Sequence, residues 1–235
     1  MKLYFAGKGI LIEDLKKTKV KNKLYSYVND KKEAMSWGEG LMLDSGAFSV
    51  LTTGAVVDID ELIEFIKTYK PAEAIQLDVI GDEKKTWENY LYMKSSIPDV
   101  LPVIHYKASD EHIKRVLEAA DYILLGGLVP LNKRQKLQWL DYLYRTYKLQ
   151  NKKIHLLGVT SREILERYPA FSCDSSSWLR PRAFGSTSRG VDQKIVSALA
   201  RIDALTELKK EIEHFLDLEA HITKLWKIRG IEWEH

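Results

Sequence analysis

The sequence has little cysteine and no long apolar run. Its 235 residues include one cysteine, Cys173, so there is no disulfide framework and no Cys/His set for a structural zinc site. We therefore expect a reducing, cytoplasmic setting and no bound metal. The N-terminal apolar stretch before Glu13 and Asp14 is too short for a signal peptide, and no later segment gives an uncharged run of membrane length. A membrane partner is not expected.

The composition is that of a soluble globular protein. Hydrophobic residues make up 45% and charged residues 29% of the chain, which excludes a disordered or fibrous protein. The formal net charge of +3 is weak evidence for a polyanionic partner. Basic residues gather in the second half of the chain, where they fit either solvated helix faces or phosphate contacts. They are Lys133, Arg134, Lys136, Arg145, Lys148, Lys152, Lys153, Arg180, Arg182 and Arg189.

Short apolar segments alternate with stretches of helical spacing, which predicts a parallel sheet covered by helices. The seven predicted strands lie at 3–7, 41–46, 74–80, 100–106, 122–127, 154–159 and 170–175, with 181–188 as an eighth candidate. Predicted helices include 58–70, 109–120 and 134–149. We expect a (β/α)8 TIM-type barrel over residues 1–190, trimmed or irregular in places. Residues 191–235 are expected to form a C-terminal helical extension packed on the barrel, so that the whole is a single domain.

Polar residues end five of these seven apolar segments. In barrels and open parallel sheets alike, ligands bind at the carboxyl ends of the strands and in the loops that follow. A sheet with a purely structural role does not require polar groups there. The residues are Asp44-Ser45-Gly46, Asp78, His105, Gly126-Gly127, and Asp174 followed by Ser175 to Ser177.

Two of these residues, Asp44 and Asp174, are a candidate catalytic pair. Aspartates at the ends of different strands can face each other across a barrel mouth, and paired carboxylates suit glycosyl transfer, in which one attacks or stabilises the anomeric carbon and the other moves a proton. Taken singly, each aspartate also fits a turn or helix-cap role.

Five segments carry a family resemblance. They are LDSGAFS at 43–49, QLD at 76–78, LLGGLVP at 124–130, HLLGVTSREIL at 155–165 and FSCDSSSWLR at 171–180. In this order they resemble the tRNA-guanine transglycosylase superfamily, over about residues 40 to 185. The resemblance implies Asp44 as acid/base and Phe48 as the ring that stacks on the base. It further implies a base-binding role for Asp78, Gly126, Gly127 and Leu128.

The resemblance also implies a mechanism. The nucleophilic aspartate attacks C1′ of a nucleotide, guanine leaves, and a 7-deazaguanine base replaces it without any cofactor. Asp174 is the expected nucleophile, at a shift of two positions from the family pattern. The partners implied are a nucleic acid, DNA or tRNA, and the incoming base, with a homodimer or a partner subunit as further expectations.

The chain departs from the family in three ways. It lacks the cysteines of the usual zinc subdomain, it has His105 and Tyr106 where the family has a glutamine and a glycine, and it is short, which favours DNA over tRNA. His105 is expected to donate to the base edge. Two alternatives remain: a metal-independent barrel N-glycoside hydrolase, and a non-catalytic partner subunit.

Three arginines follow the expected nucleophile. They are Arg180, Arg182 and Arg189. We expect them to contact backbone phosphates, which would position a strand without reading its sequence. The alternative is that they pair with Glu207 or Glu211 and dock the C-terminal helices on the barrel.

Overall fold

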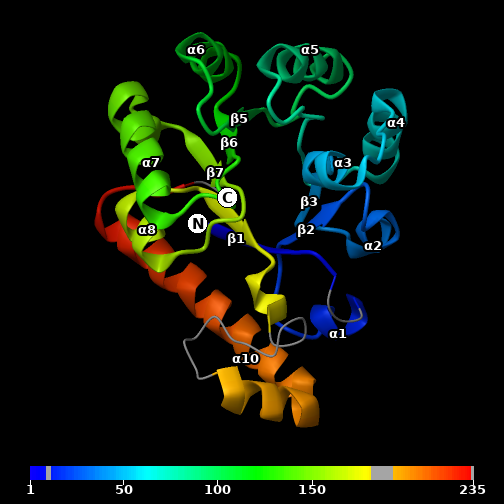
Figure 1. The fold of residues 1–235 in the computed structure, drawn as a ribbon, viewed down its shortest axis with the longest axis vertical. Helices are drawn as coiled ribbons and strands as arrows, with labels where there is room; N and C mark the ends of the chain where they lie inside the picture. Colours follow the sequence, from blue (N-terminus) through cyan, green and yellow to red (C-terminus); the bar gives the residue numbers. More distant parts are fainter. Residues whose placement is uncertain (9–11, 181–192, 234–235) are drawn as a thin grey trace.

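A computed structural model describes residues 1–8, 12–180 and 193–233, with side chains of the last helix from residue 206 onward (Figure 1). Eight parallel strands form one sheet in the order β4-β3-β2-β1-β8-β7-β6-β5. The strands are β1 Lys2–Ala6, β2 Lys23–Ser26, β3 Leu41–Asp44, β4 Glu73–Ala74, β5 Val103–His105, β6 Tyr122–Gly126, β7 Lys153–Leu156 and β8 Ser172–Ser175.

Helices follow the strands and lie around the outside of the sheet (Figure 1). The α-helices are α1 Ile12–Lys16, α2 Lys31–Trp37, α3 Ala47–Thr53, α4 Ile59–Tyr69, α5 Glu83–Lys94, α6 Asp110–Ala119, α7 Lys133–Tyr147, α8 Arg162–Arg167 and α10 Gln193–Ile228. Two 3₁₀ turns, η1 Leu149–Asn151 and η2 Ser177–Leu179, complete the described elements.

The sheet curls but does not close as a regular barrel. Its edge strands β4 and β5 share no ladder; the two edges meet at one isolated parallel bridge between Ile75 and Leu101. The expected parallel α/β architecture is confirmed, whereas regular closure is not found. The reason is the brevity of β4, whose two residues offer too little edge for a continuous ladder.

Two apolar clusters show which face of each strand points inward. A small cluster lies inside the curl and includes Met42, Val103 and Leu124, while a larger one between sheet and helices includes Leu43, Ile104 and Cys173. Side chains alternate between the two faces of a strand. The last inward positions of several strands are therefore at the carboxyl edge of the sheet.

The predicted helices begin where their capping residues stand. Asp58 accepts backbone N–H bonds at the start of α4, Ser109 does so at α6, and Asn132 and Gln135 form a reciprocal capping box at α7. The helices predicted at 58–70, 109–120 and 134–149 are confirmed within one or two residues at each end.

The eighth described strand is β2, which the sequence pattern did not indicate. Its four residues, KLYS, begin with a lysine that is fully buried and donates from Nζ to the carbonyl oxygen of Phe5 at 2.5 Å. Lys23 also lies over the Tyr25 ring at 4.3 Å. The candidate strand at 181–188 lies outside the described residues.

The long helix α10 lies against β1, α8 and η2. The indole N–H of Trp226 donates to the carbonyl oxygen of Leu165 at 2.8 Å, and the Glu219 carboxylate accepts from the backbone N–H of Leu3 at 2.7 Å. The helix is thus fixed to the sheet and to α8. None of the described helices is long and apolar enough to cross a membrane.

Candidate functional site

The inward-facing carboxyl edge of the sheet gathers four of the predicted site residues. Asp44 follows inward-facing Met42 by two positions and His105 follows Val103 in the same way. Gly126 stands two residues after inward-facing Leu124, and Asp174 stands next to outward-facing Cys173. The two-residue period of the strands therefore directs these positions to one side, as the pattern of polar strand ends predicts.

Asp44 stands at the end of β3, just before a sharp turn into α3. Gly46 adopts φ +88°, and a Cβ there would collide with Val28, so this turn requires glycine. Burial, and then repulsion from Asp78, raise the pKa of Asp44 to about 7, with a smaller contribution from Asp174; the Gly46 N–H acts in the opposite direction. A carboxyl with this pKa can both give and take a proton near neutral pH.

Asp174 is buried at 7% exposure, and its two hydrogen bonds with described residues both end on Oδ1. The backbone N–H of Gly158 donates at 2.8 Å, and Nε2 of His155 lies at 3.1 Å. Gly158 has φ +67°, and a Cβ there would collide with Val129. The loop after β7 thus holds one carboxylate oxygen and leaves Oδ2 outside these contacts.

A buried polar chain supports Asp174 from within the sheet. His155 is fully buried, and its Nδ1 lies 2.7 Å from Oγ of Ser172, which lies 2.7 Å from the Tyr122 hydroxyl. Burial raises the pKa of Tyr122, so the phenol keeps its proton. Tyr122 then donates to Ser172, Ser172 to Nδ1, and Nε2–H to the carboxylate, which makes every donor point toward Asp174.

Sequence reasoning missed His155 as a functional residue. A signal was present, because His155 in β7 lies two positions before Leu157, which packs against the inner cluster, and so takes the inward parity. Its partners Ser172 and Asp174 both come from β8, and Tyr122 of β6 contacts Ser172; no local pattern links these three strands.

Asp78 forms a second polar pair with His105. Nε2 of His105 lies 2.8 Å from Oδ2 of Asp78, and the Ser45 hydroxyl donates to Oδ1 at 3.3 Å. Nδ1 of His105 is buried and has no hydrogen-bond partner among the described residues. When the neutral ring donates from Nε2 to the carboxylate, Nδ1 is a hydrogen-bond acceptor, and no donor from the described residues reaches it.

The remaining predicted base-binding residues lie in three settings. Phe48 is 65% exposed on α3, four residues after Asp44. Gly127 is exposed and, with His105, lines a cavity of about 360 Å³ above β4, β5 and β6. Gly126 is buried and its carbonyl oxygen accepts from the Tyr106 N–H at 3.1 Å. Leu128 is fully buried in the outer core, so only its backbone could meet a ligand.

The predicted phosphate-contacting arginines are described in part. Arg180 follows η2 directly and lines a cavity beside α10. Arg182 and Arg189 lie outside the described residues. Glu207, one of the alternative partners, forms an ion pair with Lys210 at 2.8 Å. Among the described residues, no group of three or more His, Cys, Asp or Glu side chains is arranged to hold a metal ion.

These features define an α/β protein whose curled parallel sheet collects aspartates and histidines at its carboxyl edge. No family model matches the chain. Among curated proteins, it is 25% identical over 161 residues to uncharacterized protein 306 of Sulfolobus islandicus rod-shaped virus 1. The match covers 64% of this chain and 53% of the viral protein, so the chain spans about half the length of that relative.

Proposed function

We propose that the chain is a nucleic-acid base-exchange transglycosylase. It replaces guanine with a 7-deazaguanine derivative through a covalent aspartyl-glycosyl intermediate, on the scaffold of a trimmed TIM-type barrel. The motifs at 43–49, 76–78, 124–130, 155–165 and 171–180 support the proposal by their resemblance to the tRNA-guanine transglycosylase superfamily. DNA is proposed ahead of tRNA as the polymer.

One observation carries the proposal: the buried carboxyl of Asp44 lies near two further aspartates that come from other segments of the chain. Burial, then repulsion from Asp78 and a smaller repulsion from Asp174, raise the pKa of Asp44 to about 7. A carboxyl with its pKa raised in this way suits the acid/base role beside a second carboxyl that acts as nucleophile. A turn or cap aspartate, the simpler account of either residue alone, does not require partners on distant strands.

The proposed steps use two residues, Asp174 and Asp44. Oδ2 of Asp174 attacks C1′, the bond from C1′ to the base nitrogen breaks, and the protonated Asp44 gives its proton to the leaving guanine. The incoming base then loses a proton to Asp44 as its nitrogen attacks C1′, and the bond to Asp174 breaks. The enzyme returns to its starting protonation state.

The base site is built from the second polar pair and the exposed aromatic ring. Asp78 and His105, joined by a hydrogen bond of 2.8 Å, offer a carboxylate and an imidazole to a purine edge. Phe48 is free to stack on a flipped base because its ring is exposed. The Gly126-Gly127 backbone can approach the base closely.

The test offers labelled guanine, together with single-stranded DNA, duplex DNA or tRNA in separate reactions, and measures label in the polymer. We expect incorporation into DNA, and none with Asp174→Asn. The exposed Asp99→Asn variant, which makes the same chemical change outside the site, keeps activity.

A covalent adduct that maps to a residue other than Asp174 would contradict the proposed nucleophile. Base release without incorporation would point instead to the N-glycoside hydrolase. If the protein neither releases a base from any of the polymers nor incorporates one, the proposed activity is wrong.

A further inference from the structure

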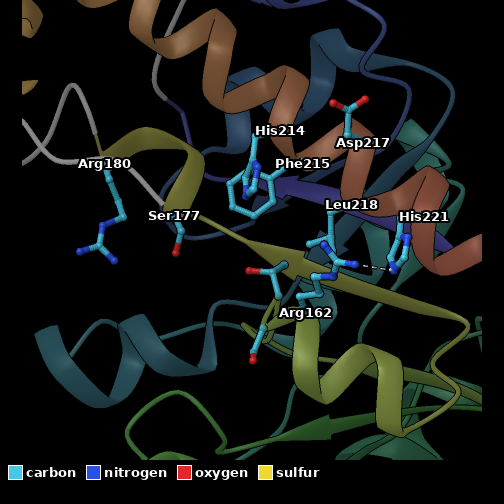
Figure 2. Close-up of a pocket in the computed structure, with 10 residues that line it drawn as sticks. Arg162, Ser177, Arg180, His214, Phe215, Asp217, Leu218 and His221 are labelled. Carbon is cyan, nitrogen blue, oxygen red and sulfur yellow. Dashed lines mark hydrogen bonds between the residues drawn. The ribbon is translucent and has the colours of Figure 1, made fainter. Parts of the chain in front are cut away.

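A second cavity lies beside the C-terminal helix. Of the predicted site residues, only Arg180 lines it. It has a volume of about 590 Å³ and lies between the start of α8, η2 and the second half of α10 (Figure 2). Its lining residues are Thr160, Ser161, Arg162, Ser177, Arg180, His214, Phe215, Asp217, Leu218 and His221.

The lining is basic and rich in hydrogen-bond donors. Arg162 and Arg180 carry positive charge, Asp217 is the one acidic side chain among the lining residues, and three hydroxyl side chains and two histidines add polar groups. Figure 2 shows Arg162 turned toward His221, with Arg180 extending from the end of η2 beyond Ser177. Such a set of groups is suited to an anion with several oxygens.

Arg162 keeps donors for such an anion. Its Nε donates to the Glu166 carboxylate at 2.7 Å, and its Nη2 lies 3.2 Å from Nε2 of His221. Nε2 of His221 also lies 2.8 Å from the same Glu166 oxygen, and one ring nitrogen cannot donate to Glu166 and accept from Arg162 at once. The guanidinium has five N–H donors, and these two contacts with described residues use at most two of them.

The cavity shares two loops with the proposed active site. Gly158, which donates to Asp174, is two residues before Thr160, and Asp174 is three residues before Ser177. The loops after the seventh and eighth strands are also where TIM-type barrels frequently bind phosphate groups. A phosphate in this cavity would therefore belong to a molecule that also reaches Asp174.

We propose that this cavity binds a backbone phosphodiester of the nucleic-acid strand, beside the target nucleotide. The identity of the anion as a strand phosphate rests on the proposed function. The same groups would also recognise the phosphate monoester of a free nucleotide. The helix α10 then serves substrate binding through His214 and His221, in addition to packing on the sheet.

The test measures fluorescence anisotropy of a 3′-labelled single-stranded DNA 12-mer with a 5′-hydroxyl end, over a series of salt concentrations. The variants are Arg162→Gln and, as matched control, Arg115→Gln. Arg115 forms the same kind of i,i+4 pair with a glutamate, Glu111, on the distant helix α6. Melting temperatures of all proteins check the fold.

We expect Arg162→Gln to weaken binding about tenfold and to reduce the salt slope by about 0.7, the value for one lost phosphate contact on a single strand. Arg115→Gln should leave both unchanged. Inorganic phosphate should compete weakly, and a guanosine monophosphate no better than inorganic phosphate.

Equal loss in both variants, an unchanged slope in Arg162→Gln, or no binding by the wild type overturns the proposal. A mononucleotide that binds here better than the oligonucleotide overturns the phosphodiester assignment. If binding follows the expected pattern but no base is exchanged, the cavity assignment stands and the proposed function fails. If Arg162→Gln exchanges bases with unchanged KM, the cavity assignment fails and the proposed function stands.

Discussion

Replacing Asp44 with asparagine should stop turnover and stabilise the fold above neutral pH. The pKa of this carboxyl is raised to about 7 from its ordinary value of 3.8. Between these values the folded protein holds a proton that the unfolded chain has lost, so wild-type stability falls as pH rises through this window. Above about pH 7 the full cost of the buried charge is present. Asparagine keeps the volume and carries no charge.

A shift of this size corresponds to about 4 kcal/mol as an upper value. Because Asp44 remains partly exposed, solvent screens the charge, and we expect a gain of about 1–3 kcal/mol for Asp44→Asn at pH 8.5. At pH 4, where the wild-type carboxyl is already protonated in the folded state, the two proteins should have nearly equal free energies of unfolding.

Urea unfolding at pH 4, 5.5, 7 and 8.5 measures this difference, with Asp99→Asn as the control for loss of an exposed carboxylate. A variant that is no more stable than the wild type at pH 8.5, or equally stabilised at pH 4, would refute the electrostatic description of the site. Stabilisation together with unimpaired base exchange would remove Asp44 from the mechanism.

Four further outcomes are expected. His155→Leu should lower kcat by up to about 100-fold with little change in KM, because Asp174 loses one of the two donors that orient it. His155→Gln should restore part of the loss, and a change in KM alone would contradict this positioning role. Phe48→Ala should leave the free energy of unfolding within about 0.5 kcal/mol, since the ring is exposed, yet raise KM about tenfold through lost stacking; unchanged KM would exclude Phe48 from base binding. Burial lowers the pKa of Lys23 to about 7 from 10.5. Between these values the unfolded chain holds a proton that the folded protein has lost, so the free energy of unfolding should rise with pH across this window. Lys23→Met should flatten that rise in urea unfolding, and equal slopes in both proteins would show that Lys23 is not its source. Exchange activity should survive exhaustive chelation, because the proposed steps use carboxylates alone; loss of activity that one divalent metal restores would contradict this.

The sequence by itself determined much of the architecture. Apolar segments of strand length, alternating with amphipathic stretches, could form only a parallel sheet covered by helices, because parallel strands need long crossover connections. Capping residues such as Asp58 and Asn132 marked the helix starts, because their side chains satisfy N–H groups within a few residues. The two-residue period of the strands directed Asp44, His105 and Asp174 to the inner carboxyl edge.

Tertiary structure decided the rest, because the contacts involved join residues far apart in the chain. The strand β2 is four residues long and opens with a lysine, and only its place between β1 and β3 makes it a strand. Asp174 receives its donors from β7 and from the loop that follows it, and the support of His155 comes from β8 and, through Ser172, from β6. The cavity beside α10 exists only because a helix that begins almost twenty residues after β8 returns to pack on α8 and η2. Local periodicity specifies which face a side chain takes, whereas the partner across that face depends on packing of the whole chain.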